Sequence, residues 1–101
     1  MNPDAQLRFQ PGSLLATPGA DALLRAHDVA PVQLLARHLS GDWGELCAED
    51  RKANEAALKT GARLLSCYRI GGERLWIITD AAPGGDPLVR ATTTFLLPSE
   101  Y

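Results

Sequence analysis

The glycine pair Gly71-Gly72 constrains the fold most strongly, because it separates two segments that both have the composition of a β-strand. Residues 63–70 and 73–79 are rich in β-branched, aromatic and other apolar residues. Two such segments joined by two glycines predict a β-hairpin with a two-residue turn. The turn also fixes the register, and the predicted pairs are Ile70 with Glu73, Arg69 with Arg74, Tyr68 with Leu75, Cys67 with Trp76 and Leu65 with Ile78.

This register gives the two faces of the hairpin different characters. One face is apolar and aromatic, and it carries Leu64, Tyr68, Ile70, Leu75 and Ile77. On the other face Arg69 lies directly opposite Arg74, beside the indole of Trp76. Like charges at opposite positions are mildly destabilising, so an anion or an acidic partner is one reason for their presence. The alternative is that both side chains extend into water while their methylene groups cover Trp76.

One further strand is predicted after the hairpin, and one at the start of the chain. Residues 89–97 alternate in polarity and predict a final strand that pairs antiparallel with its predecessor. The connecting residues 81–87 are rich in glycine and proline, which indicates a mobile loop. Residues 13–16 predict a short strand, which could pair parallel or antiparallel beside the final strand.

Proline and glycine mark the ends of three predicted helices between these strands. Thr17-Pro18 provides an N-cap followed by proline in the first turn of one helix. Pro31 begins a second helix, which Gly41 ends. A third helix runs from about residue 47 to 60. Its buried side is expected to be formed by Ala53, Ala57 and Leu58.

The predicted order is a short N-terminal strand, three helices and an antiparallel three-strand meander, with the helices packed on one face of the sheet. This is an α+β fold. Residues 1–11 contain two prolines and little periodicity, so we expect a flexible N-terminal end. Residues 12–101 are then expected to form a single α+β domain, which is usual for a chain of 101 residues.

Composition indicates an ordinary globular domain and bears on the cellular compartment of the protein. Hydrophobic residues make up 46% and charged residues 22% of the chain, as in ordinary globular domains. The longest apolar run, residues 75–78, is too short to cross a bilayer, and the start of the chain lacks the features of a signal peptide. We therefore expect a cytoplasmic protein with no membrane partner. Cys47 and Cys67 lie far apart and form no CxxC pair, which favours two free thiols.

Charge is distributed unevenly along the chain. Residues 1–50 hold three basic and seven acidic residues, a net charge of -4, whereas residues 51–101 hold seven basic and five acidic residues, a net charge of +2. The total of -2 does not predict general attraction to phosphate backbones. The imbalance could steer a charged partner towards one side of the molecule.

The candidate catalytic residues lie at the end of the second predicted helix. His38 and Asp42 are four residues apart there, and with Glu45 and Arg51 they could form an acid-base set for cleaving RNA. The alternative is ordinary capping, because a histidine near a helix C-terminus interacts favourably with the last carbonyls and an aspartate stabilises a turn.

Neither a metal nor a cofactor is expected from the sequence. His27, His38, Asp42 and Cys47 lack the close paired spacing of a metal site. The chain has no glycine-rich phosphate-binding motif, since its glycine pair belongs to a hairpin turn.

Four segments together form a distinctive pattern: residues 35–45 (LARHLSGDWGE), 64–68 (LLSCY), 75–79 (LWIIT) and 92–101 (TTTFLLPSEY). Over residues 12–101 this joint pattern resembles a family of small bacterial proteins labelled plasmid-related. The resemblance implies a setting in plasmids, integrated elements and phage-like islands, and it carries no functional residue over to this chain. Residues 81–87 look like an added loop relative to that family.

We therefore expect a non-enzymatic protein-binding module of a bacterial mobile element, which acts as an accessory or inhibitor of host defence or DNA-processing machinery. The expected partner is a protein, and the expected state is a monomer or a small homo-oligomer. Aromatic and arginine side chains are favoured interface anchors. The candidate binding residues are Arg69, Arg74, Trp76 and Arg90, with the 81–87 loop and Trp43 as further candidates. Trp43 also fits a core position, where its loss would mainly unfold the helical half.

Two alternatives stay open at this point. The first is a ribonuclease-like toxin that uses His38 with Glu45 or Arg51. The second is a nucleic-acid-binding protein that uses the strand arginines, namely Arg63, Arg69, Arg74 and Arg90.

Overall fold

The computed structural model describes residues 6–101 and has the predicted α+β fold. Its elements are β1 (Ser13–Ala16), α1 (Pro18–Ala26), α2 (Pro31–Leu39), α3 (Ala48–Thr60), β2 (Leu64–Ile70), β3 (Glu73–Thr79), β4 (Thr92–Leu96) and a 3-10 turn, η1 (Pro98–Glu100). This order confirms the predicted strand, three helices and three further strands. Residues 1–5 of the predicted flexible end lie outside the described residues.

The strands form one sheet in the order β1-β4-β3-β2. β2 pairs antiparallel with β3, and β3 pairs antiparallel with β4, while β1 lies parallel to β4. All five predicted hairpin pairs are present, including Arg69 with Arg74. Gly71 and Gly72 have φ angles of 57° and 89°, which a tight hairpin turn requires and which glycine adopts without strain.

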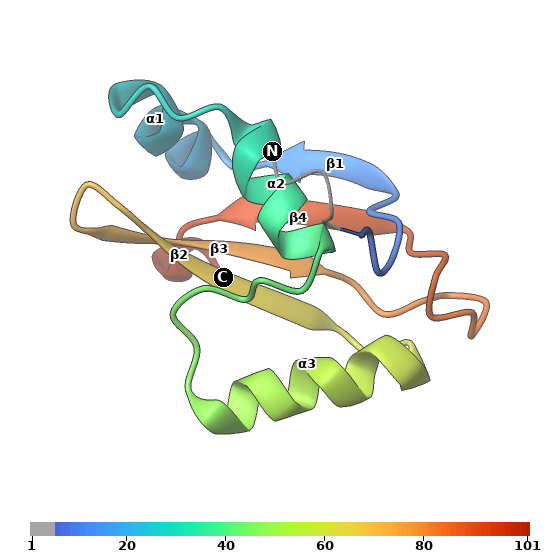
Figure 1. The fold of residues 1–101 in the computed structure, drawn as a ribbon. Coiled ribbons are helices and arrows are strands. Elements are labelled where there is room, and N and C mark those ends of the chain that lie inside the picture. Colours follow the sequence, from blue (N-terminus) through green and yellow to red (C-terminus); the bar gives the residue numbers. More distant parts are fainter. Residues whose placement is uncertain (1–5) are drawn as a thin grey trace.

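α1 and α2 cover one face of the sheet, the one that carries the apolar residues of the hairpin, whereas α3 lies beside the edge strand β2 and corrects the expectation that all three helices pack on one face (Figure 1). α1 and α2 build the larger core cluster, which contains Ala20, Leu23, Leu24, Leu34, Tyr68, Ile70, Leu75, Ile77 and Phe95. A second cluster beside α3 contains Phe9, Leu39, Trp43, Ala57 and Leu64. Leu35 of α2 packs against both clusters, so the core is continuous.

Residues 6–11 are part of the packed fold, in contrast to the flexible end that was predicted for them. Phe9 is 2% exposed and lies in the cluster beside α3. The backbone amide of Arg8 donates to the carbonyl of Leu39 at 2.8 Å, and its guanidinium pairs with Glu55 at 2.9 Å. A single buried aromatic residue leaves no periodic pattern, which is why sequence reasoning missed this segment.

β4 begins three residues later than predicted, at Thr92. Val89, the first residue of the predicted strand, is 53% exposed. Arg90, a candidate binding residue, is instead 3% exposed. A regular pleat cannot direct this side chain inwards at that position, so residues 89–91 depart from strand geometry.

The backbone around Gly44 lies against β2 and pairs with one part of its outer edge. Gly44 forms a parallel bridge with Cys67, whose amide donates to the carbonyl of Trp43 at 3.0 Å. The amide of Glu45 donates back to the carbonyl of Cys67 at 2.7 Å. Gly44 has a φ of 73°, and a Cβ atom there would lie 2.0 Å from the Cys67 carbonyl oxygen, so only glycine fits.

The side chain of Asn54 closes the neighbouring part of the same edge. Its amide nitrogen donates to the carbonyl of Leu65 at 2.6 Å, and its oxygen accepts from the Leu65 amide at 3.1 Å. Asn54 therefore pairs with β2 as a strand residue would. Asn54 is 3% exposed whereas Ala53 is exposed, so the predicted buried side of this helix was wrong at Ala53.

Candidate functional site

His38 lies inside the molecule, with an exposed fraction of 0%. Its Nδ1 atom lies 2.6 Å from the Ser66 hydroxyl, and its Nε2 atom lies 2.8 Å from the Thr79 hydroxyl. Thr79 in turn is 2.7 Å from the hydroxyl of Thr93, which donates to the carbonyl of Pro11 at 2.8 Å. This buried chain of hydrogen bonds joins α2 to β2, β3, β4 and the N-terminal segment.

Burial determines the charge state of His38. Desolvation lowers its pKa from 6.5 to about 3, so the ring is neutral at physiological pH. The rings of Phe9 and Trp43 pack edge-on against it, with centroids 5.3 Å and 5.9 Å away. Both ring nitrogens have hydroxyl partners, and neither reaches the surface. The expected capping of carbonyls at the helix end by His38 is therefore also wrong.

The structure does not bring Glu45 and Arg51 to His38. Glu45 pairs with Arg69 on the outside of the molecule, at 3.3 Å. Arg51 donates to the backbone carbonyls of Leu46 at 3.0 Å and Gly44 at 2.8 Å. The three candidate catalytic residues thus occupy three separate environments, and the expected acid-base set is not assembled.

Asp42 has the structural role that ordinary capping predicted. Its carboxylate accepts from the Arg37 guanidinium at 2.7 Å and from the Gly44 amide at 3.2 Å. The hydrogen bond from Arg37 is the main reason that the Asp42 pKa lies below its usual value. Tyr68 donates its hydroxyl to the Asp42 carbonyl at 2.6 Å, and so ties the turn to β2.

Trp43 belongs to the core, as its alternative interpretation predicted. Its side chain is 4% exposed, and its indole nitrogen donates to Glu55 at 3.0 Å. Trp43 is therefore not available as an interface anchor.

The outer face of the sheet carries the predicted arginine pair and Trp76. Arg69 and Arg74 are exposed and directly opposite each other. Tyr101, 71% exposed, packs edge-on against Trp76 with ring centroids 5.7 Å apart, and Arg63 donates to the Tyr101 hydroxyl. We call these five residues the outer basic-aromatic face. Tyr101 was not predicted to contribute, because its position depends on the η1 turn, which returns the end of the chain to β3.

The arginines of this face differ in their pairing. Arg69 lies 3.3 Å from Glu45, and Arg63 lies 3.7 Å from Asp80. Among residues 6–101, Arg74 has no carboxylate within salt-bridge distance. Arg74 is thus the cation of this face that a partner can reach without displacing an internal ion pair.

Arg90 is not part of this face, which corrects the expectation that it binds a partner. Its guanidinium lies in the interior and donates to the backbone carbonyls of Ala57 at 3.0 Å, Gly61 at 3.0 Å, Ala62 at 2.5 Å, Asp80 at 3.3 Å and Pro87 at 2.8 Å. These bonds hold the C-terminal end of α3 against the connection between β3 and β4. Arg90 is a structural residue in an environment rich in carbonyl oxygens.

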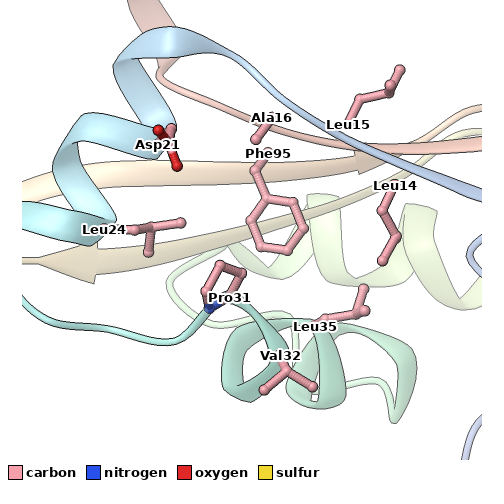
Figure 2. A pocket seen from close by; sticks show the side chains of 9 residues that line it. All are labelled: Leu14, Leu15, Ala16, Asp21, Leu24, Pro31, Val32, Leu35 and Phe95. Carbon is pink, nitrogen blue, oxygen red and sulfur yellow. The ribbon is translucent and has the colours of Figure 1, made fainter.

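An apolar groove of about 330 Å³ lies between β1 and the helices (Figure 2). Its lining consists of Leu14, Leu15, Ala16, Asp21, Leu24, Pro31, Val32, Leu35 and Phe95. Figure 2 shows Leu14 and Phe95 on the strand side, facing Pro31 and Leu35 of α2. Sequence reasoning missed this groove, because it forms only where β1 docks beside β4 above α2.

Within residues 6–101, no cluster of three or more metal-ligating side chains is present. Cys47 is exposed and Cys67 is buried, so the described cysteines form no disulfide, as expected. Burial raises the pKa of the Cys67 thiol. None of the described helices is long and apolar enough to span a membrane.

Comparisons with protein-family models, with curated proteins and with solved structures found no match for this chain.

Proposed function

We propose that the protein is a small non-enzymatic protein-binding module, and that its partner contacts the outer basic-aromatic face. This proposal rests on one observation: three arginines and two aromatic rings lie together on the face of the sheet opposite α1 and α2. Tyrosine, tryptophan and arginine are the residue types that most often anchor protein interfaces.

The chemistry of this face favours an acidic partner surface. Arg74 is exposed and lacks an internal carboxylate partner among the described residues, while its strand neighbour Trp76 offers an apolar surface beside it. A carboxylate of the partner would relieve the repulsion between Arg74 and the opposite Arg69. The exposed ring of Tyr101 extends the apolar contact.

We further propose that the protein acts in a bacterial mobile element. In that setting we propose an accessory or inhibitor of host defence or DNA-processing machinery, which acts by occupying the partner's surface. The ribonuclease-like alternative receives no support from the site geometry, because its proposed base, His38, is enclosed and engaged at both ring nitrogens.

Capture from lysate of the bacterial host tests the proposal. The tagged protein is used at two salt concentrations, and the proteins and nucleic acids that co-purify are identified. The Arg74→Ala/Trp76→Ala double variant is expected to lose at least about tenfold of the captured partner, since each side chain is an anchor residue. The control is Arg25→Ala/Leu88→Ala, which removes an exposed arginine and an exposed apolar side chain elsewhere and should capture normally.

Circular dichroism shows whether both double variants keep the fold. Equal capture of a stoichiometric protein by the Arg74→Ala/Trp76→Ala variant would contradict the proposed surface.

A nucleic-acid-binding function is the second candidate, and the same face supports it. Arginines beside the exposed ring of Tyr101 and the half-buried ring of Trp76 suit stacking on single-stranded nucleic acid. This function predicts recovery of nucleic acid in the capture experiment, with an amount that falls steeply as salt increases. Recovery of a protein that persists at the higher salt concentration favours the protein-binding function instead.

A further inference from the structure

The two edges of the sheet differ in how far their outward backbone groups are paired. The edge of β2 is closed by the Gly44 bridge to Cys67 and by the side chain of Asn54 on Leu65. At the opposite edge, β1 pairs with β4 on one side only, and no other strand of residues 6–101 pairs with its second side.

The backbone of β1 presents hydrogen-bonding groups at this open edge. The amides of Ser13 and Thr17 donate to carbonyls on the β4 side, each at 2.9 Å. Because the pleat alternates, the amides and carbonyls of Leu14 and Ala16 point to the opposite side. The strand, Ser13–Ala16, contains no charged residue and no proline, which are the usual protections of an edge strand.

The side chains next to this edge are apolar and exposed. Leu14 is 53% exposed, and Val32, across the groove on α2, is 67% exposed. Figure 2 shows Leu14 on the strand side and Val32 on α2, with Leu35 between them and the ring of Phe95 beside Leu14. An added strand would therefore lie with every second side chain directed into the groove.

We infer that the β1 edge binds an extended peptide segment of another protein by strand addition, with an aliphatic side chain of that segment in the groove. This site is separate from the outer basic-aromatic face and goes beyond the function proposed for it. The backbone of the peptide pairs with Leu14 and Ala16, and its groove-facing side chain contacts Val32, Leu35 and Phe95.

The dimensions of the site favour a peptide over a second copy of this chain. β1 has four residues, which corresponds to about 13 Å of strand. Pairing over this length cannot supply the roughly 1,200 Å² of buried surface that a stable interface needs. A single extended segment requires no such area, because the groove encloses its side chain and the edge pairs its backbone.

The charge of the groove lining predicts one further feature of the peptide, namely a basic residue. Asp21 is the one charged residue among the residues that line the groove, and its side chain is 52% exposed. Its partner Arg25 is 80% exposed, so this ion pair is weak and accessible. The peptide is expected to carry a lysine or arginine that reaches Asp21 from the strand end near Ala16.

Selection from a random library of short displayed peptides tests the inference. The immobilised full chain is expected to enrich peptides with aliphatic residues at every second position and a basic residue at one end. The variant Val32→Lys places a charge in the groove at an exposed position, so the fold is preserved and affinity for an enriched peptide falls about tenfold or more. Val89→Lys, at a valine of similar exposure outside the lining, should bind within about twofold of the unmodified chain.

NMR of the labelled chain locates the bound peptide. The amides of Leu14 and Ala16 should gain protection from hydrogen exchange on peptide addition, while the amides beside Arg74 and Trp76 should not change. The variant Asp21→Lys should shift the enriched terminal residue from basic to acidic.

Three results would overturn the inference. One is enrichment of the same peptides by the chain and by Val32→Lys. The second is a bound peptide that perturbs only the outer basic-aromatic face. The third is protection of Leu14 and Ala16 without peptide, together with a dimer in sedimentation equilibrium, which would assign the edge to a second copy.

Discussion

The buried ring of His38 makes the stability of the folded state depend on pH. Its pKa is lowered to about 3 in the folded protein, whereas the ordinary value is 6.5. Below pH 6.5 the unfolded chain therefore binds a proton that the folded chain does not bind. Above pH 6.5 neutral His38 makes its full contribution to the free energy of unfolding. This contribution is lost as the pH falls from 6.5 towards 3.

We expect the free energy of unfolding to fall by up to about 1.4 kcal/mol per pH unit between pH 6.5 and about pH 5, a range in which most carboxylates stay ionised. Urea denaturation at a series of pH values measures this slope. His38→Gln, which cannot titrate, should remove most of it. An unchanged slope in His38→Gln would show that other groups produce the pH dependence.

Sequence reasoning identified His38 as special but assigned it the wrong chemistry. Its partners Ser66 and Thr79 lie 28 and 41 residues further along the chain, on two different strands. Hydroxyl residues are common in strands, so nothing in the sequence marks these two as partners of a histidine. Arg90 was wrongly predicted to bind a partner for a related reason. Its hydrogen-bond acceptors are backbone carbonyls, which every residue has, so no residue type in the sequence marks them.

At the scale of single elements, Asn54 substitutes for a neighbouring strand. Replacing it by leucine would leave the amide and the carbonyl of Leu65 without partners in a largely buried place. We expect Asn54→Leu to lower the free energy of unfolding by about 2–4 kcal/mol, since two backbone groups lose their hydrogen bonds. Chemical denaturation gives the stability change, and hydrogen exchange should show faster exchange of the Leu65 amide.

Lys52→Leu on the exposed side of α3 is the matched control for this change. It adds the same side chain to the same helix, and its effect should stay within about 0.5 kcal/mol. A similar destabilisation in both variants would mean that the edge-closing hydrogen bonds of Asn54 contribute little.

The elements that the sequence predicted well are those controlled by local rules. The two-residue turn at Gly71-Gly72 leaves one register for the hairpin, and that register was found. The parallel pairing of β1 with β4 depends on residues about 80 positions apart, and local patterns left its direction open. The groove beside β1 follows from that pairing, so it was also beyond local rules.

At the scale of the whole molecule, the two core clusters are expected to unfold together. Leu35 packs against both, and the hydrogen bonds of His38 join α2 to three strands. A continuous core of this kind predicts a single two-state transition. The prediction differs from the expectation that loss of Trp43 would mainly unfold the helical half.

The Trp76→Phe variant provides the measurement, because Trp43 is then its single tryptophan. Fluorescence of Trp43 reports the cluster beside α3, and far-ultraviolet circular dichroism reports all helices and strands. We expect the two signals to give the same urea midpoint. Separate midpoints would show that the cluster beside α3 unfolds independently.

The α+β class and the order of elements followed from hydrophobic patterning and from the positions of proline and glycine. The candidate site was predicted only in part: Arg69, Arg74 and Trp76 lie on one face as expected, whereas His38, Glu45 and Arg51 lie apart. Successive side chains of a strand point to opposite faces of the sheet, so the residues that share a face of the hairpin can be read from the sequence. Which residues of different helices and strands come together depends on how those elements pack, and local patterns do not give this.

The closed edge of β2 also limits how far copies of this protein could assemble. Fibre growth by edge pairing needs two reactive edges on every subunit, one to accept a neighbour and one to offer to the next. Here Gly44 and Asn54 pair the outward backbone groups of Cys67 and Leu65 on the β2 edge, whereas no strand of residues 6–101 pairs with the outer side of β1. Two copies that paired through their β1 strands would leave exposed only their β2 edges, which are largely closed. Fibre growth through this sheet would therefore be disfavoured beyond a dimer.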